Sequence, residues 1–84
     1  MNAKRGLMDM RRLVGRNVRK FRLAKGLTQE QFATLCGCGQ NYLSDLERGR
    51  RNPTVVTLWN LAQSLGVTPV DLITPDDEDR TGTA

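Results

Sequence analysis

Residues 29–48 read QEQFATLCGCGQNYLSDLER, and this stretch decides the fold more than any other part of the chain. Its apolar residues recur at helical spacing on both sides of Cys36-Gly-Cys-Gly39, a glycine-rich segment long enough only for a tight turn. Gly37 is free to take the positive φ that such a turn requires. We therefore expect two short helices that pack at a steep angle, with Leu43 and Leu46 of the second facing the first.

Capping signals place three further helices around this pair. From about Asp9 to Lys25 the apolar residues recur at helical spacing, and Gly26 follows in the usual C-terminal glycine position. Thr28-Gln-Glu-Gln31 has the form of a capping box and opens the first helix of the pair. Thr54 caps a fourth helix that ends near Leu65. Thr68-Pro69 starts a fifth, because proline suits the first helical position.

The predicted organisation is one compact all-α domain of five helices over residues 9–73, with the two-helix motif at residues 29–48. We expect a flexible basic lead-in over residues 1–8 and a disordered acidic tail over residues 74–84. The expected core contains Leu13, Val14, Val18, Phe21, Phe32, Ala33, Leu35, Leu43, Leu46, Leu58, Leu61, Ala62, Leu65, Leu72 and Ile73. No stretch approaches the ~20 apolar residues of a membrane span, so a cytoplasmic location is expected.

The charge distribution and the residue composition favour some classes of function and exclude others. The 84 residues include 13 Lys and Arg against nine Asp and Glu, and nine of the basic residues fall within residues 1–26. Such a segment favours a negatively charged partner such as nucleic acid, although a solvated helix face has the same composition. Histidine is absent, and Cys36 and Cys38 alone cannot complete a zinc site. Without a nucleophile and base pair or a phosphate loop, we expect no enzyme, metal or cofactor.

The two cysteines are interpreted as small apolar residues of a reduced protein, with a redox-sensing role as the alternative. Polar residues on the second helix of the motif carry more information. Gln40, Asn41, Ser44 and Asp45 lie on the face opposite its apolar residues. Gln and Asn are the side chains that can bridge both edge groups of adenine in the major groove.

The chain resembles the Cro/repressor-type helix-turn-helix family, also called the xenobiotic-response-element family. The resemblance lies in residues 26–33 (GLTQEQFA), 40–54 (QNYLSDLERGRRNPT), 61–62 (LA) and 65–72 (LGVTPVDL), and it covers about residues 13–73. It implies a five-helix, lambda-repressor-like fold in which the second helix of the motif is the recognition helix.

The resemblance also implies roles for individual residues. Base readout would fall to Gln40, Asn41, Ser44 and Asp45. Contacts to the DNA backbone would come from Thr28, Gln29, Tyr42, Arg48, Arg50 and Arg51. For Tyr42, contact with a thymine methyl group and plain packing are the alternatives. Arg22 and Glu47 match a structural pair that ties the first helix to the end of the recognition helix.

Two departures from the family pattern affect these expectations. Cys38 and Gly39 stand where valine and then serine or threonine are usual, which weakens the expected helix cap. Asp45 stands where a positive or neutral residue is common. Its carboxylate repels phosphate, but it can accept a hydrogen bond from cytosine N4, or it can simply face Arg48.

Geometry favours a homodimer, because one such domain presents one helix to one groove and two half-sites lie about 34 Å apart. We expect the contact to involve Val67, Val70, Leu72 and Ile73, although a monomer would leave these residues as core alone. Trp59 is expected first to cover the edge of the core, with a place in the contact as the alternative. The sequence thus predicts a sequence-specific regulator of transcription that binds a near-palindromic site on double-stranded DNA, as a repressor or a restriction–modification controller does. The alternative is an antitoxin-like protein-interaction module that also binds DNA, and the short acidic tail counts against it.

Overall fold

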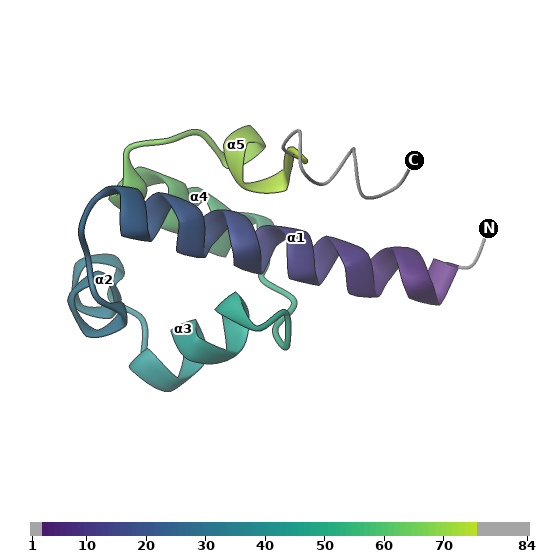
Figure 1. Ribbon diagram of the computed structural model, residues 1–84, viewed down its shortest axis with the longest axis horizontal. Helices are drawn as coiled ribbons and strands as arrows, with labels where there is room; N and C mark the ends of the chain where they lie inside the picture. Colours follow the sequence, from purple (N-terminus) through teal and green to yellow (C-terminus); the bar gives the residue numbers. More distant parts are fainter. Residues whose placement is uncertain (1–2, 76–84) are drawn as a thin grey trace.

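Five α-helices form the described part of the protein (Figure 1). The computed structural model describes residues 3–75, with side chains over residues 10–75. The helices are α1 (Ala3–Ala24), α2 (Gln29–Cys36), α3 (Gln40–Glu47), α4 (Val55–Leu65) and α5 (Pro69–Ile73). Residues 3–75 contain no strand, and the predicted all-α class with five helices is confirmed. None of the helices in this range is long and apolar enough to cross a membrane.

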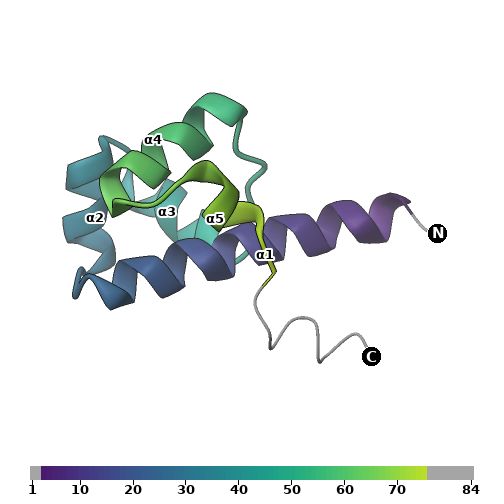
Figure 2. The same ribbon diagram turned by 90° about the horizontal axis from the view of Figure 1, so that it is seen from above.

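The long helix α1 runs through the middle of the molecule, and the other helices pack around its C-terminal half (Figures 1 and 2). In Figure 1, α3 lies on one side of α1 and α5 lies on the other. The helix begins at Ala3 rather than near Asp9, so part of the expected flexible lead-in is helical. Alanine, lysine, arginine, leucine and methionine dominate this part of the chain, and these residues favour helix. Most of the expected acidic tail lies outside the described residues.

Side-chain caps fix the helix starts where the sequence predicted them. The Thr28 hydroxyl accepts from the backbone N–H of Gln31 at 3.1 Å, and the Gln31 side chain accepts from the Thr28 N–H at 2.9 Å. This reciprocal pair is the expected capping box of α2. Thr68 and Asp71 form the same arrangement at α5, and Thr54 caps α4. Local sequence therefore determines these three helix starts.

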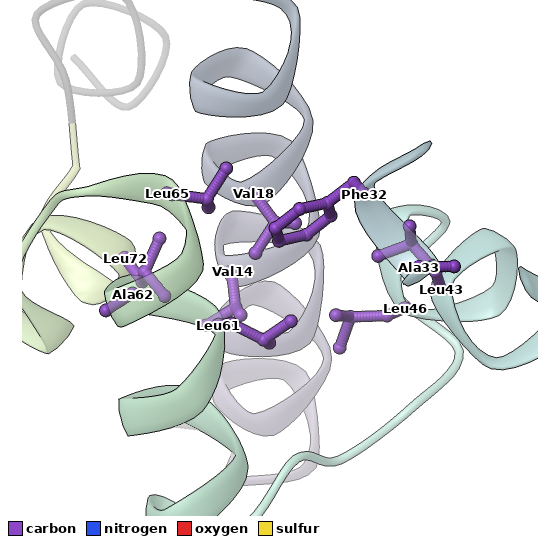
Figure 3. Packing of buried hydrophobic residues seen from close by; sticks show 10 residues of the cluster. All are labelled: Val14, Val18, Phe32, Ala33, Leu43, Leu46, Leu61, Ala62, Leu65 and Leu72. Atoms are coloured by element: carbon purple, nitrogen blue, oxygen red, sulfur yellow. The ribbon is translucent and has the colours of Figure 1, made fainter. Parts of the chain in front are cut away.

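The core lies where α1, α2, α3, α4 and α5 meet (Figure 3). Its buried residues are Val14, Val18, Phe32, Ala33, Leu43, Leu46, Leu61, Ala62, Leu65 and Leu72. Two expected core residues are exposed: Leu35 keeps 60% of its surface and Ile73 keeps 41%. Leu35 lies about 100° around α2 from Cys36, which packs on the core, so it falls outside the inward stripe. Ile73 ends α5, where its neighbour Leu72 takes the inward position.

Two buried positions in α1 set how its neighbours approach, and neither was predicted. A Cβ atom at Gly15 would lie 2.8 Å from the carbonyl oxygen of Glu47 and closer still to that of Leu46. Glycine therefore lets the end of α3 lie directly against α1. Asn17 is 2% exposed, and its Nδ2 donates to the carbonyl oxygen of Leu72 at 2.9 Å, which ties α5 to α1.

Candidate nucleic-acid interface

Helix α3 lies at the outside of the molecule (Figure 1), and its solvent face is polar. Its two leucines are fully buried, while Gln40 and Asn41 are exposed and Ser44 and Asp45 are half-buried. The four residues predicted to read bases thus come from the solvent side of one helix that the core holds in place. A single α-helix of this kind fits the major groove of B-DNA.

The turn between α2 and α3 occupies residues 37–39. Gly37 takes the left-handed conformation, with φ +72°, and Gly39 is the N-cap of α3 without a side-chain bond. Cys36 and Cys38 are free thiols that pack partly buried against the core. Burial, helped by the neighbouring Cys36, raises the pKa of the Cys38 thiol to about 12. Cys38 is therefore a neutral, weakly polar packing residue near neutral pH.

The C-cap of α3 and the loop after it carry Arg48, Arg50 and Arg51, all of them exposed. The course of the loop is fixed by backbone hydrogen bonds, in which Arg50 N donates to the carbonyl oxygen of Asp45 at 2.9 Å. Gly49 is buried at φ +78°, and a Cβ there would lie 2.9 Å from Arg12 Cγ. The close packing of Gly49 on α1 places the arginines at the edge of the polar face of α3.

Asp45 pairs with Arg51 rather than with Arg48. Arg51 Nη2 lies 3.4 Å from Asp45 Oδ2, and the Arg51 guanidinium carbon lies 5.2 Å from the centroid of the Tyr42 ring. Tyr42 is itself half-buried and packs against the core. These three residues form what we call the Asp45–Arg51–Tyr42 cluster.

A second, buried network joins three helices. Arg22 Nε donates to Glu47 Oε2 at 2.6 Å and Arg22 Nη2 donates to Glu47 Oε1 at 3.0 Å, so the expected pair is in direct contact. Arg22 Nη1 also donates to the carbonyl oxygen of Leu27 at 2.7 Å. Gln29, expected at a phosphate, donates from Nε2 to Glu47 Oε1 at 3.1 Å. One of the two N–H donors of its amide is therefore engaged inside the protein, while Thr28 stays exposed at the start of α2.

The residues expected at a subunit contact divide into two groups. Trp59, Val70 and Ile73 are exposed by 54%, 63% and 41%. Val67 is half-buried against the core, and Leu72 is fully buried, so Leu72 belongs to the core of a single chain rather than to a contact surface. Val55 and Val56 at the start of α4 are also exposed, although periodicity alone did not single them out.

Two short helices joined by a three-residue turn, with a polar outer face and an arginine-bearing loop, define a helix-turn-helix DNA-binding domain. Solved structures agree with this class. The hypothetical transcription factor NHTF from Neisseria superposes with a TM-score of 0.79 at 33% identity, covering 93% of this chain and 88% of that one. The restriction–modification controller protein C.Esp1396I, a tetramer in complex with its natural 35 base-pair operator, gives 0.69 at 33% identity, covering 75% and 83%.

Sequence comparison leads to the same family. A family profile described as helix-turn-helix matches residues 18–72. The uncharacterized HTH-type transcriptional regulator y4dJ of Sinorhizobium fredii is 60% identical over 76 residues, which cover 90% of this chain and 99% of the relative. Control protein C.BamHI of Bacillus amyloliquefaciens is 39% identical over 66 residues, covering 77% and 82%. The chain belongs to the helix-turn-helix family of DNA-binding transcriptional regulators, which confirms the resemblance predicted from its sequence.

Proposed function

We propose that this regulator binds a near-palindromic operator as a homodimer, as a small repressor or a restriction–modification controller protein does. One observation carries the proposal: the solvent face of α3 is polar and adjoins a loop with three exposed arginines. Polar side chains with amide groups suit base edges, and arginines suit phosphates. Within this proposal the protein acts in the cytoplasm by occupying DNA, and no catalytic step is part of it.

The position of each side chain supports a division of roles. Gln40 and Asn41 occupy the first turn of α3, and the N-terminal residues of a recognition helix are those that contact base edges. Ser44 follows one turn later on the same side. Arg48 and Arg50 lie at the other end of the helix and in the loop, where phosphates pass the edge of a major groove.

The exposed apolar residues of α4 and α5 support the dimer. They are Val55, Val56, Trp59, Val70 and Ile73. Large apolar side chains left at the surface mark contact sites, and tryptophan is enriched in interfaces. Because α5 lies on the side of α1 away from α3, a two-fold contact through α4 and α5 leaves both recognition helices free (Figure 1). Two copies of α3 would then meet successive major grooves about 34 Å apart.

Fluorescence anisotropy with two labelled duplexes tests the proposal. One duplex carries the DNA upstream of the protein's own gene, and the other carries the same bases in scrambled order. We expect the upstream duplex to remain bound at near-physiological salt, while the scrambled duplex loses most of its affinity between low and near-physiological salt. Equal, salt-sensitive binding to both would count against this operator, and no binding to either would favour the interaction-module alternative.

A further inference from the structure

Asp45 places a carboxylate on the DNA-facing side of α3, where the charge of phosphate opposes it. Its side chain is 34% exposed and has one partner in the structure, the guanidinium of Arg51, whose side chain is 48% exposed. An exposed ion pair of this length is weak, so a phosphate can compete with Asp45 for Arg51.

Tyr42 keeps Arg51 near the DNA-facing surface whichever anion Arg51 contacts. The ring lies one turn before Asp45 on α3 and is held by the core, and the guanidinium lies over it at 5.2 Å. Stacking on an aromatic face does not depend on the carboxylate. The guanidinium therefore needs only a small movement to exchange Asp45 for a phosphate.

That exchange leaves Asp45 without a counter-ion in a strongly negative environment. The lost interaction with Arg51 is replaced only if the DNA supplies a hydrogen-bond donor to the carboxylate. In the major groove, cytosine offers its N4 amino group, whereas the adenine amino group lies beside the N7 acceptor, which repels a carboxylate. Guanine presents only acceptors there, and thymine presents an acceptor and a methyl group.

We propose that Asp45 is a specificity-determining residue that releases Arg51 to a phosphate only on DNA with a cytosine opposite its carboxylate. On other DNA the protein either keeps the Asp45–Arg51 pair and loses a phosphate contact, or leaves the carboxylate unpaired. Asp45 thus contributes to specificity mainly by lowering the affinity for DNA that lacks this cytosine, because its charge is repelled there. The inference rests on the proposed function, because it requires sequence-specific binding to DNA.

The test compares wild type with Asp45→Asn, which keeps the shape and removes the charge. Asp77→Asn is the matched control, because it makes the same change of net charge in the acidic segment that follows the described residues, where the proposal places no contact. Each protein first selects from a duplex library with a randomised centre. Each is then titrated with one scrambled duplex at several salt concentrations, and circular dichroism checks that all three proteins are folded.

We expect the wild-type selection to contain a cytosine position that is absent from the Asp45→Asn selection. Asp45→Asn should bind the scrambled duplex about three- to tenfold more tightly than wild type does. The fall of its affinity with salt concentration should be steeper by the amount that about one additional phosphate contact produces. Adding Arg51→Ala should abolish the steeper salt dependence, because Arg51 makes the additional contact. Asp77→Asn should match wild type in both measurements.

Two results would overturn the inference alone. One is a wild-type selection that converges on a sequence which Asp45→Asn selects equally. The other is an affinity of Asp45→Asn for scrambled DNA no higher than that of Asp77→Asn. A wild-type library that fails to converge on any sequence would instead refute the proposed function, and this inference would fall with it.

Discussion

Arg22 on α1 and Glu47 at the end of α3 form a two-bond ion pair, with side chains exposed by only 8% and 4%. Glu47 also accepts a hydrogen bond from Gln29 on α2, so a single carboxylate joins three helices. The planar guanidinium and the carboxylate match in a fixed geometry, which sets the direction of α3 relative to α1. The orientation of the proposed reading face therefore depends on a buried contact between helices.

Removing one member of the Arg22–Glu47 pair should destabilise the folded protein. Arg22→Ala leaves the buried Glu47 carboxylate without its counter-ion, and we expect it to lower the free energy of unfolding by about 3–5 kcal/mol. Urea denaturation followed by circular dichroism measures the loss. The double variant Arg22→Met with Glu47→Met serves as the control, because it removes both charges and should recover most of the stability. Equal losses in the single and double variants would contradict this explanation.

Gly15 should tolerate no side chain, although alanine favours helix. The added Cβ would meet the backbone of α3, which cannot move as a flexible side chain can. We expect Gly15→Ala to lower the free energy of unfolding by about 1–3 kcal/mol, as overpacking does. At Gly39 no atom lies within 4 Å of an added Cβ. There Gly39→Ser should instead raise stability by a few tenths of a kcal/mol, because serine supplies the missing cap of α3. If urea denaturation shows that Gly15→Ala raises the free energy of unfolding, α1 and α3 can move apart without loss of stability, and this explanation is wrong.

Trp59→Asp should weaken the dimer without unfolding the chain, since Trp59 is 54% exposed in one copy. Burying a charge at the centre of an apolar contact should raise the dimer dissociation constant roughly thirtyfold, the effect of losing about 2 kcal/mol at an interface hot spot. Sedimentation equilibrium measures that constant. Leu35→Ser, a change at an exposed apolar residue on α2, should leave it unchanged. If Trp59→Asp stays as dimeric as wild type, the contact lies elsewhere.

Stability should fall in alkaline solution partly because of Cys38. Its pKa rises from 9.0 to about 12 on folding, so the folded chain keeps a proton that the unfolded chain releases. The stabilisation is therefore complete below pH 9.0 and is lost as the pH rises towards about 12. Cys38→Ala removes the titrating thiol, and its denaturation midpoint should decline less steeply than that of wild type above pH 9.0. Parallel curves for the two proteins would argue against a buried thiol at this position.

Features that depend on near neighbours in the chain could be predicted. The capping box of Thr28 and the cap of Thr68 join residues three apart, and the left-handed turn at Gly37 follows from glycine itself. The inward stripes of α3 and α4 likewise follow from helical periodicity. The pair Arg22–Glu47 was predicted only from the family resemblance, because nothing in local spacing connects two residues 25 positions apart.

Features that depend on tertiary packing could not be predicted in this way. From the sequence alone, Gly15 is a residue that lowers the stability of its helix, and only the close approach of α3 explains why a glycine stands there. Sequence reasoning offered Arg48 as an ion-pair partner for Asp45, but the course of the loop through Gly49 brings Arg51 to Asp45 instead. Gln29 reads as a free polar side chain at a helix start, but its amide donates to a carboxylate on another helix.

In the proposed complex, α3 reads bases while the loop after it holds phosphates. The most direct test is the affinity of wild type, Gln40→Ala and Arg50→Ala for a duplex selected by the wild-type protein and for a scrambled one, each at several salt concentrations. Gln40→Ala should weaken the selected duplex by about 1–3 kcal/mol and leave the scrambled one unchanged. Arg50→Ala should weaken both alike and reduce the salt slope by about 1. If the two variants weaken both duplexes in the same way, the division between a reading helix and a phosphate-binding loop is wrong.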